Sequence, residues 1–457
     1  MYNKSPIGIQ NLAASVYGHN LAVKKYSKGF NRTLNSLEKS EHLNTRDLVE
    51  LRTRELRRIV KYAYENVPYY RYTFKKHRVN PDDIRSINDI KKLPVLTKEE
   101  VRLHSKSLIS SEFNRWQYDV RHTSGTTGTA LTLVWGHDAI MKEYAFVERI
   151  RRRSGKLSSR MTHITLTGRL IIPPKQKAPP FWRVNKSEHQ YLFSMHHLTN
   201  SNLSGYIEKI KELQPVYIEG YPSLISVVAE YILQNAIELK SIKAVFTSSE
   251  TLFLYQRERI EKAFKCKVFD RYGSTELAAS IGECEFGSYH EDGEYGIIEY
   301  LRDGEDVTEN EAGEMVCTNF INSAFPLIRY KIGDLAKPSM QLCPCGRALP
   351  LVSEVIGRMD DVLITKNGAY LGRLDHIFKE THNIKESQVI QESADKVLVR
   401  VVPWSGYSEK DSKHLLNEFS KRLGEGMEIQ IQIVNKIERE KNGKFKAVIS
   451  KVKSNLQ

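Results

Sequence analysis

Residues 122–129 read His-Thr-Ser-Gly-Thr-Thr-Gly-Thr and lead directly into Ala-Leu-Thr-Leu-Val-Trp at 130–135. The first stretch holds four threonines, one serine and two glycines, so many backbone N–H groups are left free with little bulk around them. A loop of this kind can wrap an anion. It does not end in the Gly-Lys-Ser/Thr of a Walker A loop. The second stretch is apolar, partly β-branched and alternating, which is typical of a strand. The sequence therefore predicts an anion-binding loop before a strand, with a solvated hairpin turn as the alternative.

Strands and helices alternate along the middle of the chain. Apolar runs predict strands at 161–168, 216–218, 243–247 and 267–270. Helical periodicity predicts helices at 45–66, 138–154, 203–213, 222–235 and 255–265. This order favours an α/β fold with a mostly parallel sheet and helices on its faces. Four prolines between 170 and 190 predict an irregular excursion there.

The later part of the chain has a different pattern. From residue 293 onward the sequence is β-rich and predicts a smaller β subdomain. Beyond it, the pattern indicates a separate α+β unit. Its predicted strands lie near 389–391, 397–402 and 428–434, with a helix at 409–423.

The composition is that of an ordinary globular protein, with 40% hydrophobic and 27% charged residues. The chain has no run of 18 apolar residues and no secretory signal pattern, which argues against a transmembrane or secreted protein. Its five cysteines are too few and too unevenly placed for a disulfide framework. These features predict a cytoplasmic protein.

The net charge of +14 predicts attraction to anions such as a nucleotide, a coenzyme, an acidic glycan or a membrane surface. No nucleic-acid-binding module is recognisable, so a nucleic-acid partner is not expected. The densest basic cluster runs from Arg149 to Lys156, with Arg160 following. It has two interpretations, a solvated helix end or a docking patch for a polyphosphate or an acidic partner.

Residues 1–40 carry apolar side chains followed by lysines. This pattern predicts an amphipathic helix that packs on the main body, with attachment to an anionic membrane surface as the alternative. The apolar residues are Ile7, Ile9, Leu12, Val16, Leu21 and Val23.

Several short motifs follow predicted strands or lie near the C-terminus. They are Phe246-Thr-Ser-Ser-Glu250, Tyr272-Gly-Ser-Thr-Glu276, Arg329-Tyr-Lys-Ile-Gly-Asp334, Ile356-Gly-Arg-Met-Asp-Asp361 and Lys441-Asn-Gly-Lys-Phe-Lys446. Each alone could be a turn, a helix cap or surface charge. The Tyr272–Glu276 motif, which follows a predicted strand, is expected to open a helix. In this order they resemble the adenylate-forming superfamily of acyl-activating enzymes. Within it, the chain is most similar to the phenylacetate–CoA ligase family and its branch in capsular polysaccharide clusters, over roughly residues 60–450.

The resemblance implies an ATP site. The loop at residues 124–128 would hold the β- and γ-phosphates of ATP. Glu276 would hold Mg²⁺, and Thr275 would contact the α-phosphate. Asp334 would accept hydrogen bonds from the ribose hydroxyls, reinforced by Arg358. The implied ATP-binding residues are Ser124, Gly125, Thr126, Thr127, Gly128, Ser249, Glu250, Tyr272, Gly273, Ser274, Asp334 and Arg358; of these, Ser249, Glu250, Tyr272 and Gly273 would border the adenine. The acid pocket is expected near 218–225, 246–249 and the Tyr272 segment.

By the same resemblance, Lys444 would bridge the substrate carboxylate and the α-phosphate, a role that suits a point charge on a flexible stem. The usual Pro-Arg-Thr opening is missing here, and Lys446 stands where many relatives have arginine. Lys441 and Lys446 are therefore alternatives for the role, and a solvated surface lysine is another reading. Asp360 resembles the hinge about which the C-terminal domain swings.

The cysteines suggest a second site. Cys343-Pro-Cys345 is a tight turn with two thiols, and Cys284 lies six positions before His290. The four side chains could form a tetrahedral Cys₃His zinc site of a structural kind. A buried cluster of free cysteines is the alternative.

These features predict three domains: an N-terminal helical extension (1–60), an ATP- and acid-binding adenylation domain with the β-rich zinc-bearing subdomain (61–358), and a mobile α+β C-terminal domain (359–457). The expected reaction joins a small carboxylic acid to AMP with release of pyrophosphate, then transfers the acyl group to coenzyme A. Transfer of an acyl or aminoacyl group to a sugar of a surface polysaccharide is the first alternative. An inactive nucleotide-binding protein is the second. The sequence leaves the acid, the oligomeric state and peripheral membrane association open.

Overall fold

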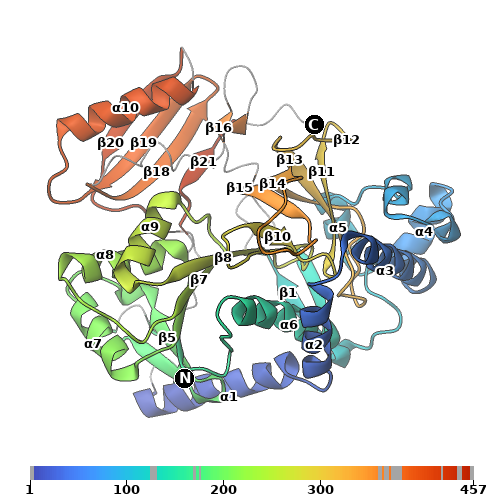
Figure 1. The fold of residues 1–457 in the computed structure, drawn as a ribbon, viewed down its shortest axis with the longest axis horizontal. Coiled ribbons are helices and arrows are strands. Elements are labelled where there is room, and N and C mark those ends of the chain that lie inside the picture. The colour runs from blue at the N-terminus through green and yellow to red at the C-terminus, as the bar shows by residue number, and fades with distance from the viewer. Residues whose placement is uncertain are drawn as a thin grey trace.

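A computed structural model describes residues 5–123, 131–167, 171–173, 176–358, 363–364, 370–371, 383–423, 426–439 and 445–452. Figure 1 shows a large body with a smaller unit at the C-terminal end of the chain. The α-helices are α1 (Ile7–Lys25), α2 (Phe30–Ser40), α3 (Thr45–Asn66), α4 (Pro68–Lys76), α5 (Lys98–Leu103), α6 (His137–Arg153), α7 (Leu203–Leu213), α8 (Pro222–Gln234), α9 (Leu254–Phe264) and α10 (Glu409–Leu423).

The body is built on one 13-stranded sheet in the order β12-β11-β13-β14-β15-β10-β9-β8-β7-β6-β3-β5-β4. Its strands are β3 (His163–Thr167), β4 (Trp182–Asn185), β5 (Gln190–Ser194), β6 (Tyr217–Gly220), β7 (Ala244–Ser248), β8 (Lys267–Gly273), β9 (Ser280–Glu283), β10 (Tyr289–Glu291), β11 (Gly296–Arg302), β12 (Glu305–Asp306), β13 (Gly313–Asn319), β14 (Tyr330–Ser339) and β15 (Leu351–Arg358). A separate ribbon pairs β1 (Tyr118–His122) with β2 (Thr132–Gly136) in antiparallel register.

The α/β fold is confirmed, but the sheet is mixed rather than mostly parallel. Among the described strands of this sheet, only the pairs β3–β5, β3–β6, β6–β7 and β7–β8 are parallel. Beyond β8 the pairing is antiparallel, so the predicted β subdomain continues the same sheet. Helices α8 and α9 cover the parallel part through a shared apolar core that includes Val228, Ile260 and Val245. Parallel strands need crossover connections, and these helices supply them.

The helices and strands predicted for the middle of the chain are present within a few residues. One prediction was wrong: the segment 170–190 is not wholly irregular, because it contains β4 and the start of β5. The pairing of β4 with β5 is antiparallel and places β4 at the sheet edge. Phe181, just before β4, is buried and stacks on His197 with ring centroids 4.6 Å apart. The prolines therefore precede an edge strand rather than fill an irregular loop.

The interpretation of residues 149–156 as a solvated helix end was wrong for most of the arginines. Arg149 is fully buried, with Nη2 2.6 Å from Asp292 Oδ1 and Nη1 2.8 Å from Glu294 Oε1. Arg151 is also buried and lies 2.6 Å from Glu219. These ion pairs tie α6 to the sheet, because buried cations require acidic partners. Among the arginines of α6, Arg152 keeps substantial exposure.

Replacing Arg149 with alanine is expected to lower the free energy of unfolding by about 3–5 kcal/mol, because two buried carboxylates would lose their shared cation. The matched control is Lys156→Ala, at an exposed residue of the same cluster, for which we expect a change within about 0.5 kcal/mol. Urea denaturation followed by circular dichroism measures both. Equal effects of the two variants would show that the buried ion pairs do not stabilise the fold.

The C-terminal unit has its own four-stranded sheet in the order β20-β19-β18-β21. Its strands are β18 (Ile384–Ser393), β19 (Lys396–Pro403), β20 (Glu428–Ile433) and β21 (Val448–Ser450), and β16 (Leu363–Ile364) pairs with β17 (Tyr370–Leu371) nearby. Val399, Phe419 and Leu415 form part of its core, so α10, which has the predicted bounds 409–423, packs against the sheet. The predicted boundary at 358/359 borders undescribed residues. The boundary at 60/61 falls inside α3, so we propose that the large domain begins at α3.

Candidate active site

The centre of the candidate site is the turn that follows β8. Tyr272 and Gly273 end the strand, and Ser274, Thr275 and Glu276 make a turn. The prediction that this motif opens a helix was wrong. Leu277 adopts a φ of +53° and is buried, and the chain then returns as β9, antiparallel to β8. The turn therefore holds its polar groups at the end of a strand.

The turn is joined to the ribbon that carries the anion-binding loop. Trp135 of β2 donates from Nε1 to the carbonyl oxygen of Thr275 at 2.8 Å. At the loop's base, Thr123 N donates to Leu131 O at 3.1 Å, and Leu131 N donates to Thr123 Oγ1 at 2.9 Å. Residues 124–130 lie outside the described residues, and with them Ser124, Gly125, Thr126, Thr127 and Gly128. The described ends of the loop therefore lie on the strand pair that contacts the Thr275 turn.

Asp334 lies next to Tyr272 and Arg358, two other residues predicted to bind the nucleotide. The Tyr272 hydroxyl donates to Asp334 Oδ2 at 2.5 Å. Arg358 lies opposite Asp334 in the β14–β15 register, and its Nε is 4.0 Å from Asp334 Oδ1. Burial, followed by the charge of Asp334, raises the pKa of Tyr272 well above its usual value, so the phenol stays protonated and can donate. Asp334 and Arg358, the residues predicted to bind the ribose, therefore lie close together, and Tyr272 joins them through its hydrogen bond to Asp334.

Glu276 is a buried carboxylate at the same place. Burial raises its pKa, and Lys98 is the cation with the largest opposing effect. Among the described residues no basic group lies within 4 Å of this carboxylate. A buried carboxylate without an ion pair suits a hard divalent cation, so the residue fits the predicted Mg²⁺ role.

Lys98 is a cation of the site that the sequence patterns did not single out. A side chain on Gly333, next to Asp334, would meet Lys98 Nζ at 3.0 Å. The segment before Lys98 is held there because Leu96 N donates to Arg329 O at 2.9 Å. In the sequence, Lys98 is marked only by Thr97, the N-cap of the short helix α5. An N-cap does not indicate that Lys98 lies beside Gly333, which is distant in the chain.

The end of β7 joins the site to the C-terminal unit. Ser249 has a φ of +71°, an unfavourable conformation for a residue with a side chain. Next to it, Glu250 Oε1 accepts from Phe445 N at 2.6 Å, and its Oε2 accepts from Ser223 N at 3.3 Å. Burial raises the pKa of Glu250. Glu250, predicted to border the adenine, thus binds the backbone directly after Lys444.

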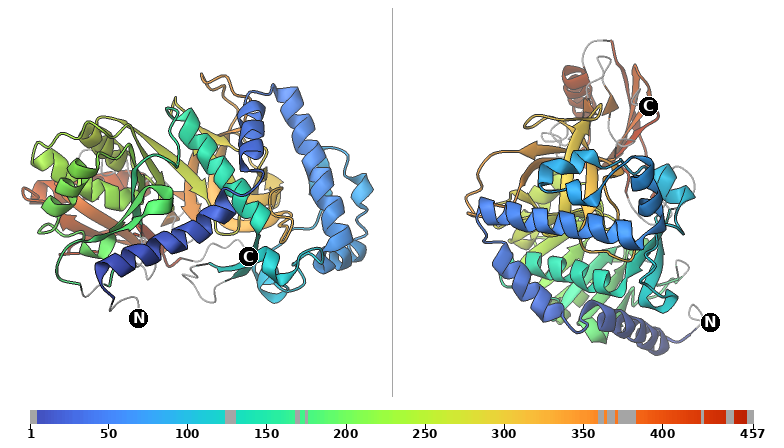
Figure 2. Two further views of the ribbon diagram at one scale, coloured as in Figure 1. Left: turned by 90° about the horizontal axis from the view of Figure 1, so that it is seen from below. Right: turned by 90° about the vertical axis from the view of Figure 1, so that its right-hand side faces the viewer.

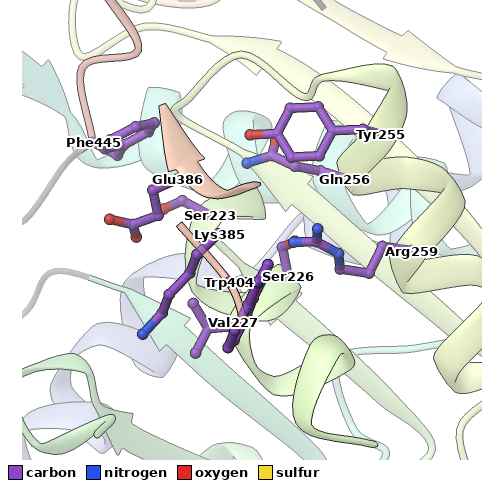
Figure 3. A pocket seen from close by; sticks show the side chains of 10 residues that line it. All are labelled: Ser223, Ser226, Val227, Tyr255, Gln256, Arg259, Lys385, Glu386, Trp404 and Phe445. Carbon is purple, nitrogen blue, oxygen red and sulfur yellow. The ribbon is translucent and has the colours of Figure 1, made fainter. Parts of the chain in front are cut away.

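Other contacts hold the C-terminal segment against α8 and α9. Phe445, Glu386 and Trp404 line a cavity of about 10 Å³ together with Ser223 and Tyr255, and the cavity has room for about one water. Figure 3 shows these side chains from close by. Arg439, for which the sequence predicts no role, pairs with Glu386 and lies 4.4 Å over the Phe445 ring. Lys444, Lys441 and Asp360 lie outside the described residues.

The predicted zinc ligands come together at the junction of β9, β10 and the 343–345 turn. The ligand atoms of Cys284, His290, Cys343 and Cys345 all lie within 4.8 Å of one another. Cys345 Sγ is 3.4 Å from His290 Nε2, and His290 Nδ1 is 3.3 Å from Leu349 O. A backbone partner on Nδ1 leaves Nε2 to bind a metal, which is a common arrangement in metal sites.

The charges around this cluster also fit zinc. The side chain of Arg153 is buried, and its three guanidinium nitrogens have no hydrogen-bond partner among the described residues. A side chain on Gly282 would meet Arg153 Nη2 at 3.1 Å, and Gly282 pairs directly with His290. Three thiolates around one Zn²⁺ carry a net charge of −1. Such a centre would give the guanidinium the counter-charge that its neighbours supply only at 3.8 Å.

The purified protein is expected to contain about one zinc ion per chain, and Cys343→Ser is expected to lose most of it. Elemental analysis measures the metal content. Cys266→Ser is the matched control, because Cys266 is a free cysteine outside the cluster and its replacement should leave the zinc in place. A chelator should lower the melting temperature of the wild type and not that of the metal-free variant. Equal zinc content in both variants would contradict the site.

Known proteins match either the whole chain or a part of it. The sequence profile of the CapK C-terminal domain matches residues 363–451. Protein CapK of Staphylococcus aureus is 29% identical over 460 residues, covering 99% of each chain. The phenylacetate–coenzyme A ligase of Aromatoleum evansii is 26% identical over 343 residues, covering 72% of this chain and 74% of the relative. The chain is homologous to CapK and to the phenylacetate–coenzyme A ligases.

The fold is also that of solved coenzyme A ligases. A structure of 2-hydroxyisobutyryl-CoA ligase in the postadenylation state, in complex with R3-HIB-AMP, superposes with a TM-score of 0.70 at 19% identity. The superposition covers 90% of this chain and 91% of that ligase. The predicted fold and the predicted resemblance are thus confirmed.

Proposed function

We propose that this protein activates a carboxylic acid with ATP, forming an acyl-adenylate and releasing pyrophosphate. The observation that carries the proposal is the grouping of Tyr272, Asp334, Arg358 and Glu276 around the turn that follows β8, in a chain homologous to coenzyme A ligases. The grouping provides a hydrogen-bond acceptor for hydroxyls and a carboxylate for a hard cation.

The chemistry explains why these groups are needed together. A carboxylate oxygen must attack the α-phosphorus, forming a C–O–P bond, while the bond to pyrophosphate breaks. Two anions therefore meet, and cations or N–H donors must offset their repulsion. Mg²⁺, held by Glu276, would supply part of that positive charge. Within the chain, the proposed sources are Lys98, Lys444 and the N–H groups of residues 124–128.

For the second step we propose coenzyme A as the acceptor, so that a thiolate takes the acyl group and AMP leaves. The phenylacetate–coenzyme A ligases among the relatives support this acceptor. One observation favours the alternative, a sugar hydroxyl or amine. CapK matches this chain over its whole length, and the CapK C-terminal domain matches the C-terminal unit, whereas the phenylacetate–coenzyme A ligases match about 70% of the chain. This favours the branch of the family in capsular polysaccharide clusters, for which a sugar acceptor is proposed.

An isotope experiment tests the first step. The acid is labelled with ¹⁸O in its carboxylate and incubated with protein, ATP, Mg²⁺ and coenzyme A, and the products are analysed by mass spectrometry. Adenylation leaves one ¹⁸O atom on AMP when the acyl group is transferred. Label in inorganic phosphate, with ADP as the other product, would contradict the proposal because it indicates an acyl phosphate.

The acceptor is distinguished in the same mixture. A thioester of coenzyme A supports the proposed second step. Labelled AMP that accumulates without a thioester, but increases when amino sugars or glycans are added, favours the sugar acceptor. ATP binding without AMP formation with any acid would favour an inactive nucleotide-binding protein.

A further inference from the structure

Helix α1 faces its polar side toward the protein. Buried Gln10 accepts from Arg183 Nε at 2.8 Å, and Lys25 Nζ lies 2.7 Å from Glu188 in a buried ion pair. The buried residues of α1 are Gln10, Gly18 and Lys25. The body thus holds this helix largely by polar contacts rather than by an apolar stripe.

The outer side of α1 is largely apolar, and it also carries the exposed polar residues His19 and Asn20. The exposed fractions are 53% for Ile9, 64% for Leu12, 53% for Val16, 59% for Tyr17 and 58% for Val23. The 3-, 4- and 7-residue spacings between Ile9, Leu12, Val16 and Val23 place them on one face of the helix. Figure 2 (left) shows α1 in front of the body when the molecule is viewed from below. A surface helix normally buries its apolar face, so this reversed arrangement indicates that something else covers that face.

The charges near the helix indicate what covers it. Residues 5–23 contain no charged side chain, and the first acidic residue of the chain is Glu38. Five lysines and arginines precede Glu38. Beyond the helix, Lys28, Arg32 and Arg160 line a hollow of about 330 Å³. No carboxylate lies within 4 Å of these three side chains in the part of the chain that the structure describes.

We propose that α1 lies flat on the surface of an anionic phospholipid bilayer. Its apolar face would enter the boundary between headgroups and acyl chains, and Lys28, Arg32 and Arg160 would bind lipid phosphates. No helix in the described ranges is both long and apolar enough to cross a bilayer. A second copy of the chain is less suitable as the occupant, because two chains with a net charge of +14 each repel one another. The inference does not depend on the chemistry proposed for Glu276.

Co-sedimentation with vesicles tests the proposal. One set of vesicles contains three parts phosphatidylcholine to one part phosphatidylglycerol, and the other contains phosphatidylcholine alone. The wild type is expected to bind the anionic vesicles at least about tenfold more strongly, with weaker binding at high salt. The double variant Leu12→Gln/Val16→Gln and the double variant Lys28→Glu/Arg32→Glu should each lose about tenfold or more in binding to the anionic vesicles.

Matched controls lie on other surfaces. Leu342→Gln removes a side chain that is 96% exposed outside α1, and Lys75→Glu/Lys76→Glu makes the same charge change on α4. Neither control should alter vesicle binding. Equal losses in controls and test variants, or no binding to anionic vesicles by the wild type, would overturn the proposal. It would also be overturned if the wild type formed a dimer that Leu12→Gln/Val16→Gln made monomeric without any vesicle binding; light scattering detects that change.

Discussion

Replacing Lys444 with alanine is expected to lower acid-dependent ATP–pyrophosphate exchange by about 10²–10³-fold and to leave the fold unchanged. Two reacting anions would lose the cation proposed to bridge them. The described neighbour Phe445 supports the placement, because its N–H group binds Glu250 at the end of β7. Glu250 lies in the Phe-Thr-Ser-Ser-Glu motif that was predicted to border the adenine. Exchange measured with radioactive pyrophosphate gives the rate, and circular dichroism checks the fold.

The neighbouring lysines are the matched controls for Lys444. Lys441→Ala and Lys446→Ala remove the same charge two or three residues away, and each should change the exchange rate by less than about threefold. Exchange at the wild-type rate in Lys444→Ala would contradict its role. Loss of exchange only in Lys446→Ala would show that the bridging cation is Lys446.

Replacing Asp334 with alanine is expected to raise the KM for ATP by about 10²-fold, with a smaller change in kcat. The carboxylate would accept hydrogen bonds from two ribose hydroxyls, and a hydrogen bond to a charged group contributes about 1.5–3 kcal/mol. Contacts made equally in the ground state and the transition state affect KM rather than kcat. Steady-state exchange at varied ATP concentration separates the two constants.

Two further variants serve as comparisons for Asp334→Ala. Asp306→Ala makes the same substitution at an exposed carboxylate of β12, and the KM for ATP should not change. Tyr272→Phe removes only the hydroxyl that donates to Asp334, and we expect a rise of only a few-fold. A fall in kcat alone in Asp334→Ala would contradict a ribose-binding role.

Local patterns in the sequence were sufficient for most of the fold. The helix at 203–213 was predicted with the bounds of α7, and the C-terminal strands and helix were found where expected. Pairing between distant strands was less predictable. The antiparallel half of the large sheet depends on which strands meet, as when β9 turns back beside β8 after Leu277. A motif that follows a strand does not reveal whether a helix or a turn comes next.

In the candidate site too, residues within sequence motifs could be predicted, whereas residues that act through contacts between distant segments could not. The residues that resemble family motifs, such as Asp334 and Arg358, were identified from the sequence, and the structure brings them together. Lys98 and Trp135 were not identified, because their roles arise from contacts between segments far apart in the chain. The arginines of α6 were misjudged for the same reason. The partners Glu219, Asp292 and Glu294 come from other elements, and no local pattern indicates that they bury the cations.

The proposed acyl-adenylate chemistry is tested most directly by ATP–pyrophosphate exchange with the wild-type protein. Purified protein is incubated with ATP, Mg²⁺, radioactive pyrophosphate and a panel of aryl, aliphatic and amino acids. The proposal predicts label in ATP that depends on at least one of these acids and requires no coenzyme A. Protein that binds ATP but shows no exchange with any acid of the panel would contradict it.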